Sequence, residues 1–228
     1  MIISCVKWGD KYNHEHVNRL YRMCQKNIDD DFMFVCHTEN PEGINSDIHI
    51  IPLGDYDLEK WWWKLCLFEK PTDDINLFFD LDVVLQSNIT HLKTLVNNKI
   101  TLIKAFWKPE FDSSIYDHNI NSSVMIWTGD QTHVWNQFID NPEYYMMKYN
   151  GIDGYLYYEH SDGIGFIPRG VVYSRMFGVD ELSNSGPDLY TMDYPICIFN
   201  GWRRETDMRD GKYLLDNEGY NGFEHYWD

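Results

Sequence analysis

Residues 75–86 read INLFFDLDVVLQ, an apolar run that two carboxylates, Asp80 and Asp82, interrupt. The five residues before Asp80 are mostly apolar, a pattern typical of a buried strand. An ionised aspartate is almost never buried unless it is paired or holds a metal, because its desolvation costs several kcal/mol. The stretch therefore predicts a cation site or an acid–base group at the end of a strand.

The composition sets limits on the kind of ligand. The chain has 228 residues and a formal net charge of -17, with 43% hydrophobic and 16% aromatic residues. No Pro-, Gly- or Ser-rich linker divides it, so we expect one domain over residues 1–228. The charge argues against nucleic acid as a partner, because nucleic-acid binding depends on Lys and Arg that neutralise phosphates. A ligand that carries phosphate would need a metal to supply positive charge.

Targeting features are absent from the sequence pattern. No segment approaches roughly 18 consecutive apolar residues, and no basic region followed by a long apolar stretch precedes the first strand-like run. We therefore expect a soluble protein without a membrane span, located in the cytoplasm, or in the host cytoplasm if a phage encodes it. The five cysteines form an odd number without CxxC spacing. We expect them to be reduced core residues.

The first hundred residues alternate between strand-like and helix-like patterns, which predicts βαβ units. Short strands are expected at 1–6, 32–36, 48–53 and 75–79. One helix is expected after Asn13, its N-cap, and a second after Asp57. Their expected apolar faces are formed by Val17, Leu20, Tyr21 and Cys24 and by Leu58, Trp61, Trp62 and Leu65.

The second half of the chain has weaker patterns. They predict a helix at 130–139 and strands within 99–107, 122–127, 164–168, 171–174 and 194–199. The strands at 164–168 and 171–174 are expected to form a hairpin across Arg169 and Gly170. From Gly211 onward the chain is polar and rich in Gly, Asn and Tyr, which predicts a loop or a flexible tail.

The position of Asp80 and Asp82 favours a site at a sheet edge, because open α/β sheets bind ligands beyond the carboxyl ends of their strands. Neighbouring side chains on a regular strand point to opposite faces, so the pair can act together only where the strand becomes a loop. Carboxylate oxygens suit a divalent cation, which can bridge the two phosphates of a sugar nucleotide. The Asp-x-Asp patterns at 29–31 and 55–57 are interpreted as solvated turns or caps.

The segment INLFFDLDVVL resembles the metal-binding segment of GT-A glycosyltransferases, especially the family 8-like group and related small phage and bacterial enzymes. Further segments are similar to that family in the expected order: CVKWGDKYNHEHVNRLY, FVCHTENPEGI, EKWWWKLCLFEK, INSSVMIW and CIFNGWRRE. The resemblance covers residues 1 to about 207. It implies an α/β GT-A fold, Rossmann-like with a mixed central sheet. Residues 1–100 would form the nucleotide-binding half, 101–210 the acceptor and donor-sugar half, and 211–228 a polar tail.

The resemblance also implies roles for individual residues. The donor-binding residues would be Lys7, Trp8, Tyr12, Lys64, Asp80, Asn121, Ser122 and Arg204. The ligands of Mn²⁺ or Mg²⁺ would be Asp80, Asp82 and Asn200. Asp153 would lie near the reacting sugar, and Asp162, beside His160, is a second catalytic candidate and a possible acceptor contact or substitute ligand. Alternative interpretations stay open: Trp8 and Tyr12 as core aromatics, and Asp153 as a helix cap after Gly151.

The chain departs from the family pattern at two positions near its end. Asn200 stands where many members have a histidine ligand, so it can offer a metal only a neutral amide oxygen. Arg204 stands where the family has a diphosphate-binding lysine, and Arg is itself a good bidentate phosphate ligand. Trp202 and Arg203 replace the usual residues of that loop.

The resemblance implies metal-dependent transfer of a hexose from a nucleotide-diphospho sugar, UDP-glucose or UDP-galactose, to a glycan or other small acceptor, with retention of the anomeric configuration. One alternative is a degenerate member that binds nucleotide sugar or glycan with little turnover. Another is a haloacid-dehalogenase-like phosphatase with Asp80 as nucleophile and Asp82 as its acid–base partner. The position of the motif, about 75 residues into the chain, disfavours the phosphatase, which normally carries it on its first strand.

Overall fold

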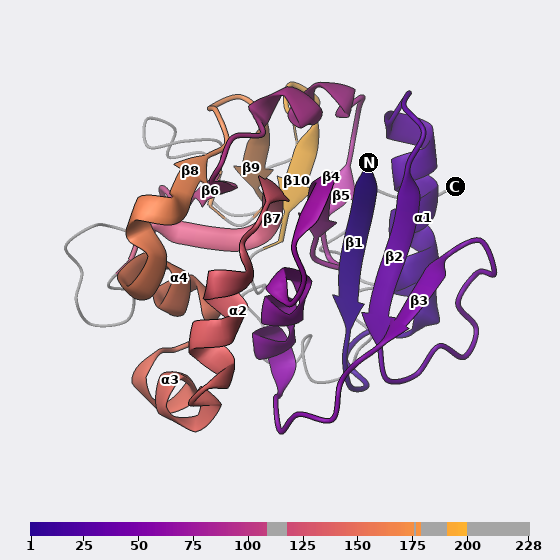
Figure 1. Cartoon of the computed structure of the whole chain (residues 1–228). Helices are drawn as coiled ribbons and strands as arrows, with labels where there is room; N and C mark the ends of the chain where they lie inside the picture. Colours follow the sequence, from indigo (N-terminus) through magenta and orange to yellow (C-terminus); the bar gives the residue numbers. More distant parts are fainter. Residues whose placement is uncertain (109–117, 176, 179–190, 200–228) are drawn as a thin grey trace.

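The structure, a computed structural model, describes residues 1–108, 118–175, 177–178 and 191–199 (Figure 1). Its strands are β1 (Ile2–Lys7), β2 (Met33–Thr38), β3 (His49–Pro52), β4 (Thr72–Phe79), β5 (Val84–Leu85), β6 (Ile100–Lys104), β7 (Ile120–Gly129), β8 (Ile164–Phe166), β9 (Val172–Ser174) and β10 (Ile196–Ile198). Its α-helices are α1 (His14–Asn27), α2 (Thr132–Ile139), α3 (Pro142–Lys148) and α4 (Ile152–His160). Its 3-10 helices are η1 (Lys60–Phe68), η2 (Thr90–Leu95) and η3 (Ser161–Gly163).

Seven strands form the central sheet, in the order β3-β2-β1-β4-β7-β6-β8. Strand β7 runs antiparallel to β4 and β6, and the other neighbouring pairs are parallel. The start of β7 therefore lies beside the carboxyl end of β4, where Val124 pairs with Phe79. One edge of the sheet thus gathers the carboxyl ends of β1, β4 and β6 and the beginning of β7.

Two hydrophobic cores cover the two faces of this sheet. On β4, Leu77 and Phe79 belong to one core and Phe78 to the other. This two-residue alternation is that of a strand buried on both faces, and it explains why INLFF is an almost continuous apolar run. Helix α1 packs in the first core, and η1, α2 and α4 pack in the second. Figure 1 shows α1 behind β2, with α2 and α4 gathered toward the β8 end.

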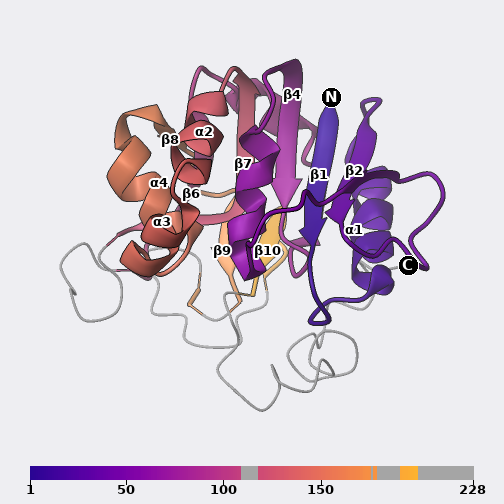
Figure 2. The same cartoon turned by 60° about the horizontal axis from the view of Figure 1, so that its bottom comes forward.

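A second sheet, with the strand order β5-β10-β9, packs on the first core (Figure 2). Strand β5 belongs to it although it begins only two residues after Asp82. Its position means that the chain leaves the central sheet at Asp80 and enters the second sheet at Val84. The segment between the two sheets is a turn, closed by a hydrogen bond from the Val83 N–H to the Asp80 carbonyl at 3.1 Å. The sequence prediction that a loop begins at Asp80 is confirmed.

Helix η1 differs from the α-helix expected after Asp57. It begins at Lys60, with Glu59 rather than Asp57 as its N-cap, and it is a 3-10 helix with three residues per turn. Trp62, Leu65 and Phe68, spaced by three residues, are buried, and so is Trp63. Trp61, expected on the buried face, is instead exposed, because a face counted at 3.6 residues per turn does not apply here.

Two further expectations need correction. The strands β8 and β9 form no hairpin across Arg169 and Gly170: β8 pairs with β6 in the central sheet, and β9 pairs with β10 in the second sheet. Alternating apolar residues mark a strand but do not choose its partner, and here the turn links two sheets. Helix α3 was not expected, and a helix after Gly151, where α4 begins, was expected only as an alternative role for Asp153, because the Tyr-rich sequences of both helices lack a clear apolar period.

Two other expectations about the fold, the cap of the first helix and the reduced cysteines, are confirmed. Asn13 caps α1 by accepting a hydrogen bond from the Glu15 N–H at 3.0 Å. All five cysteines of the sequence are free thiols, four of them buried. Within the described ranges, no helix has the length and apolarity needed to cross a membrane. The expected tail from Gly211 lies outside the described residues.

Candidate active site

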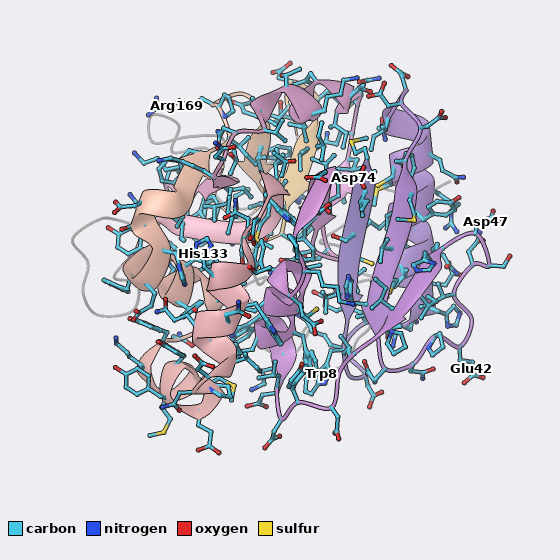
Figure 3. The ribbon with its side chains drawn as sticks, in the orientation of Figure 1. Trp8, Glu42, Asp47, Asp74, His133 and Arg169 are labelled. Atoms are coloured by element: carbon cyan, nitrogen blue, oxygen red, sulfur yellow. The ribbon has the colours of Figure 1, made fainter. Side chains whose placement is uncertain are left out.

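A cavity of about 770 Å³ opens at the edge of the sheet where β1, β4 and β6 end and β7 begins. Figure 3 shows Trp8 at this edge, whereas Asp74, near the start of β4, lies at the opposite edge. The strand directions explain the assembly, since residues that follow parallel strands meet at one edge. The cavity is lined by residues after β1 (Trp8 to Tyr12), after β4 (Asp80 to Asp82), after β6 (Trp107, Lys108) and in β7 (Asn121 to Ser123), and by residues of η1 and of the start of α4.

Asp80 continues the β4–β7 ladder by one residue, since its N–H donates to the Ser123 carbonyl at 2.9 Å. Its carboxylate is held by Lys64 of η1, whose Nζ lies 2.7 Å from Oδ1 and 2.8 Å from Oδ2. The same Nζ is 3.5 Å from Ser122 Oγ. Helix η1 therefore carries a positive charge directly to the Asp-x-Asp turn.

Asp82 has less compensation. Its Oδ2 accepts a hydrogen bond from the Tyr12 hydroxyl at 3.2 Å. Burial raises the pKa of Asp82, and the neighbouring carboxylate of Asp80 raises it further, although Lys11, Lys64 and the Tyr12 hydroxyl oppose this. The carboxylate thus lies in surroundings that would gain from an added positive charge.

Asp153, in the first turn of α4, is held from two sides. Lys108 Nζ donates to its Oδ2 at 2.8 Å and to the Ile120 carbonyl at 2.7 Å, and the Ser122 N–H donates to its Oδ1 at 3.0 Å. Burial raises the pKa of Asp153, but Lys108 and Lys64 with these hydrogen bonds outweigh it and hold the pKa below its ordinary value. Asp153 is therefore an ionised, ion-paired carboxylate, and the N-cap of α4 is Gly151.

Aromatic side chains form much of the remaining wall. Trp8 and Tyr12 come from the segment after β1, and Trp61 comes from the first turn of η1. Trp107 and Phe177 stack with ring centroids 5.8 Å apart and ring planes 3° apart. Flat apolar surfaces beside charged groups suit a ligand that has both rings and charges.

The donor set at the turn fits a hard divalent cation, because Asp80 and Asp82 present carboxylate oxygens to one cavity and Asp82 lacks a full counter-charge. The part of the chain that the structure describes holds no group of three or more His, Cys, Asp or Glu side chains arranged for a metal. Protein ligands within that part would thus be the two aspartates. Asn200, the expected third ligand, lies outside the described residues.

The structure brings most of the expected site residues together. Those that line the cavity are Trp8, Tyr12, Lys64, Asp80, Asp82, Asn121, Ser122 and Asp153. Lys7 is buried, 5% exposed, and does not line the cavity. Asp162 is exposed on η3 and does not line it either, while His160 bonds the Tyr155 hydroxyl in the second core at 3.0 Å. Arg204, like Asn200, lies outside the described residues.

The cavity residues that sequence reasoning missed include Lys11, Lys60, Trp61 and Lys108. The expectation that only a metal could supply positive charge to a phosphate ligand is weakened, since four lysines line the cavity. The position of Lys108 could have been predicted from the sequence, because Lys108 follows the apolar segment after β6 just as Asp80 follows the apolar strand β4. Trp61 carried none, since its exposure depends on the 3-10 geometry of η1.

Comparisons with known proteins show which solved structures are similar to this fold. No family model matches the sequence, and no curated protein sequence matches it. Among solved structures, the galactosyltransferase LgtC, in complex with donor and acceptor sugar analogs, has a TM-score of 0.61 and 14% identity over 97% of this chain and 99% of that one. The chain has a GT-A glycosyltransferase fold.

Two further structures extend the comparison. The glycosyltransferase GlyE of Streptococcus pneumoniae TIGR4 has a TM-score of 0.54 and 12% identity, over 74% of this chain and 45% of that one. The bifunctional glycosyltransferase WbbM has a TM-score of 0.55 and 10% identity, over 96% of this chain and 50% of that one. This chain therefore matches about half the length of each. At such low identity the likeness establishes the GT-A fold alone.

Proposed function

We propose that the protein is a glycosyltransferase of the family 8-like group that transfers a hexose from a nucleotide-diphospho sugar, with UDP-glucose and UDP-galactose as the first donors to test. The acceptor would be a glycan or another small molecule. A small phage or bacterial enzyme acting in the cytoplasm is part of the same proposal, as is a single domain over residues 1–228.

One observation carries the proposal: the Asp80–Asp82 turn lies inside the cavity at the end of β4, beside aromatic rings and next to Asn121 and Ser122. Asp80 and Asp82 would hold a divalent cation, which would supply positive charge to stabilise the diphosphate leaving group. Other residues of the chain would bind the base and orient the carboxylates. Trp8 and Tyr12 supply rings for the base, and the Tyr12 hydroxyl orients Asp82.

Lys64 would act beside the cation rather than replace it. Its Nζ is within hydrogen-bonding distance of both Asp80 oxygens, so it orients that carboxylate and adds positive charge where a diphosphate would lie. Asn121 shapes the neighbouring backbone by accepting a hydrogen bond from the Ser123 N–H at 3.1 Å. The ammonium and amide groups thus form a polar wall for the donor sugar and its phosphates.

The state of Asp153 supports the proposed retention of configuration. An inverting enzyme needs a carboxylate base beside the acceptor hydroxyl. Asp153 has a lowered pKa and its oxygens are engaged by Lys108 and the Ser122 N–H, so it is a weak base. Asp162, the other candidate, lies outside the cavity lining. We therefore assign Asp153 to positioning and drop Asp162 from the proposed site.

A second candidate function is binding without turnover. The observation that favours it is the Lys64–Asp80 ion pair, which already neutralises one of the two aspartates expected to bind the metal. The phosphatase alternative is not pursued, because the motif follows β4 rather than β1 and the similar structures are glycosyltransferases.

The test is release of UDP from UDP-glucose and UDP-galactose, measured with Mn²⁺ and with EDTA. We expect Mn²⁺-dependent release by the wild-type protein and none by Asp82→Asn. The matched control is Asp74→Asn, an exposed aspartate at the opposite edge of the sheet, which should behave as wild type. Metal-dependent UDP binding without release from either donor would favour the binding protein, and no UDP binding at all would contradict both candidates.

A further inference from the structure

Trp61 differs from the two tryptophans that follow it in the sequence. Trp62 and Trp63 are 5% and 3% exposed in the second core, where Trp62 stacks on Phe138 with centroids 5.3 Å apart. Trp61 is 45% exposed and lines the cavity. The Lys60 ammonium lies over this ring, 5.9 Å from its centroid, and the exposed remainder of the ring is accessible to a ligand, whereas Trp62 and Trp63 are committed to packing.

The Trp61 ring is fixed in place by a close approach to Gly151. A Cβ at position 151 would lie 2.7 Å from the indole Nε1, closer than atoms tolerate, and Gly151 has a φ of +103°. Only glycine meets both requirements without strain. The indole therefore rests on the backbone at the start of α4, two residues before Asp153.

Helix η1 sets the direction of the ring. In a 3-10 helix residues i and i+3 lie on the same face, so Trp61 and Lys64 point to the same side, and both line the cavity. Lys60, just before Trp61, has a φ of +56°, an unfavourable left-handed conformation for a residue other than glycine. Trp61 directly follows this strained residue and lines the cavity rather than the core.

We propose that Trp61 is the stacking platform for a hexopyranose ring of the acceptor. This inference rests on the proposed function and names the substrate class of its second site. The C–H bonds on one face of a pyranose form an apolar surface that packs on an indole, while the hydroxyls at the rim stay available for polar groups. A rigid tryptophan loses little conformational entropy on such binding.

The acceptor is favoured over the donor base by position. Trp8 and Tyr12 stand after β1, where Tyr12 also bonds Asp82 of the Asp-x-Asp turn. Trp61 instead lies against Gly151, two residues before Asp153 in the sequence, and its side chain is partly exposed to solvent. A saccharide that enters after the donor is bound would meet this exposed ring.

The experiment is saturation-transfer NMR with lactose, cellobiose and maltose at millimolar concentration, with and without UDP and Mn²⁺. We expect at least one disaccharide to bind the wild-type protein, Trp61→Ala to weaken that binding about tenfold, and Trp61→Phe to retain most of it. The matched control is Tyr158→Ala, which removes a ring that is 44% exposed but lies outside the cavity lining. It should bind the saccharide as wild type does.

Three results would overturn the inference: no disaccharide binds the wild type, Trp61→Ala binds as well as wild type, or Trp61→Ala loses UDP affinity to the same extent as saccharide affinity. The last would make Trp61 part of the donor site. Circular dichroism of each variant shows whether it is folded. If Trp61→Ala is not folded, the saccharide affinity of Trp61→Phe is used to test the inference instead. The saccharide titration without UDP does not depend on donor binding. If UDP fails to bind, the proposed function is contradicted, and this titration still tests the role of Trp61.

Discussion

Asp153 and Asp82 are both partly buried in one cavity, yet their surroundings shift their pKa values in opposite directions. Asp153 has a lysine on one oxygen and a backbone N–H on the other, so its charge is matched within the protein. Asp82 has a neutral tyrosine hydroxyl and a second carboxylate nearby. The charge of Asp153 is balanced by its neighbours within the protein, whereas burial and Asp80 disfavour the charge of Asp82, and this difference is the basis for the proposed cation site.

Ser122 joins the two ends. Its N–H donates to Asp153, and its hydroxyl oxygen lies 3.5 Å from Lys64, which holds Asp80. Ser122, at the start of β7, thus lies in contact with Asp153 at one end and close to Lys64 at the other. The predictions below separate the ends by asking which losses a divalent cation can restore.

The largest effect is expected for Asp82→Asn. The change removes the ionised oxygen that the proposed cation needs, so the rate of UDP release should fall by about a thousandfold. Stability should hold or rise, because burial and Asp80 disfavour the ionised carboxylate. Kinetics and thermal unfolding of the same sample check both parts, and an unfolded variant would instead make the turn a structural element.

The next effect is expected for Lys108→Met, which leaves Asp153 buried without its cation. Removing one partner of a buried pair should lower the free energy of unfolding by about 3 kcal/mol. Mn²⁺ should not restore it. The control is Lys148→Met, which breaks a solvent-screened surface pair with Glu159 and should lower the free energy of unfolding much less. Urea denaturation measures both, and equal losses would contradict the distinction between a buried and a surface pair.

Acid should destabilise the protein independently of metal. Burial lowers the pKa of His16 to about 4, so the unfolded chain, with a pKa near 6.5, binds the proton first as pH falls. The stabilising contribution of neutral His16 is thus complete above about pH 6.5 and is lost toward pH 4, amounting to about 3 kcal/mol.

The variant His16→Gln tests this acid effect. His16 accepts from the Asn13 N–H in the capping box of α1, and glutamine also suits that position. We expect a smaller loss of stability between pH 7 and pH 4 than in wild type, measured by urea denaturation at each pH. An unchanged pH slope would remove His16 as a cause.

A smaller and reversible effect is expected for Lys64→Met. The loss of the ammonium leaves Asp80 and Asp82 facing each other, which should lower stability by about 1 to 2 kcal/mol in EDTA. Mn²⁺ should restore more of the stability of this variant than of Lys108→Met, because a cation can replace Lys64 but not Lys108. Thermal unfolding with and without Mn²⁺ measures this stabilisation. If Mn²⁺ stabilises Lys64→Met and Lys108→Met equally, the proposed difference between the two ends of the cavity is contradicted.

Much of the fold was predictable because each strand carried its own apolar run and was followed by a turn. The end of β4 could be placed from residues 75–86 alone, since two carboxylates cannot continue a strand buried on both faces. The choice of partner for β8 and β9 could not, because it depends on which sheet has a free edge. The Lys108–Asp153 pair could not be predicted from the sequence either, since the two residues are far apart in the chain and meet only when β6, β7 and α4 pack.

The exposed position of Trp61 was missed for a local reason. Counting at 3.6 residues per turn placed it with Trp62 and Leu65, whereas η1 has three residues per turn and buries Trp62, Leu65 and Phe68. The pattern of apolar residues identified a helix but not its type. Sequence reasoning thus found the carboxylates of the cavity and missed the ring that stands beside them.

The central claim is that the Asp80–Asp82 end of the cavity is a cation site that binds the diphosphate of a sugar nucleotide. Isothermal calorimetry of UDP binding, in Mn²⁺ and in EDTA, tests it most directly when wild type and Asp82→Asn are compared. We expect Mn²⁺ to tighten UDP binding at least about tenfold in wild type, roughly 1.4 kcal/mol, and to have no such effect in the variant. Equal UDP affinity in Mn²⁺ and EDTA for the wild-type protein would contradict the claim.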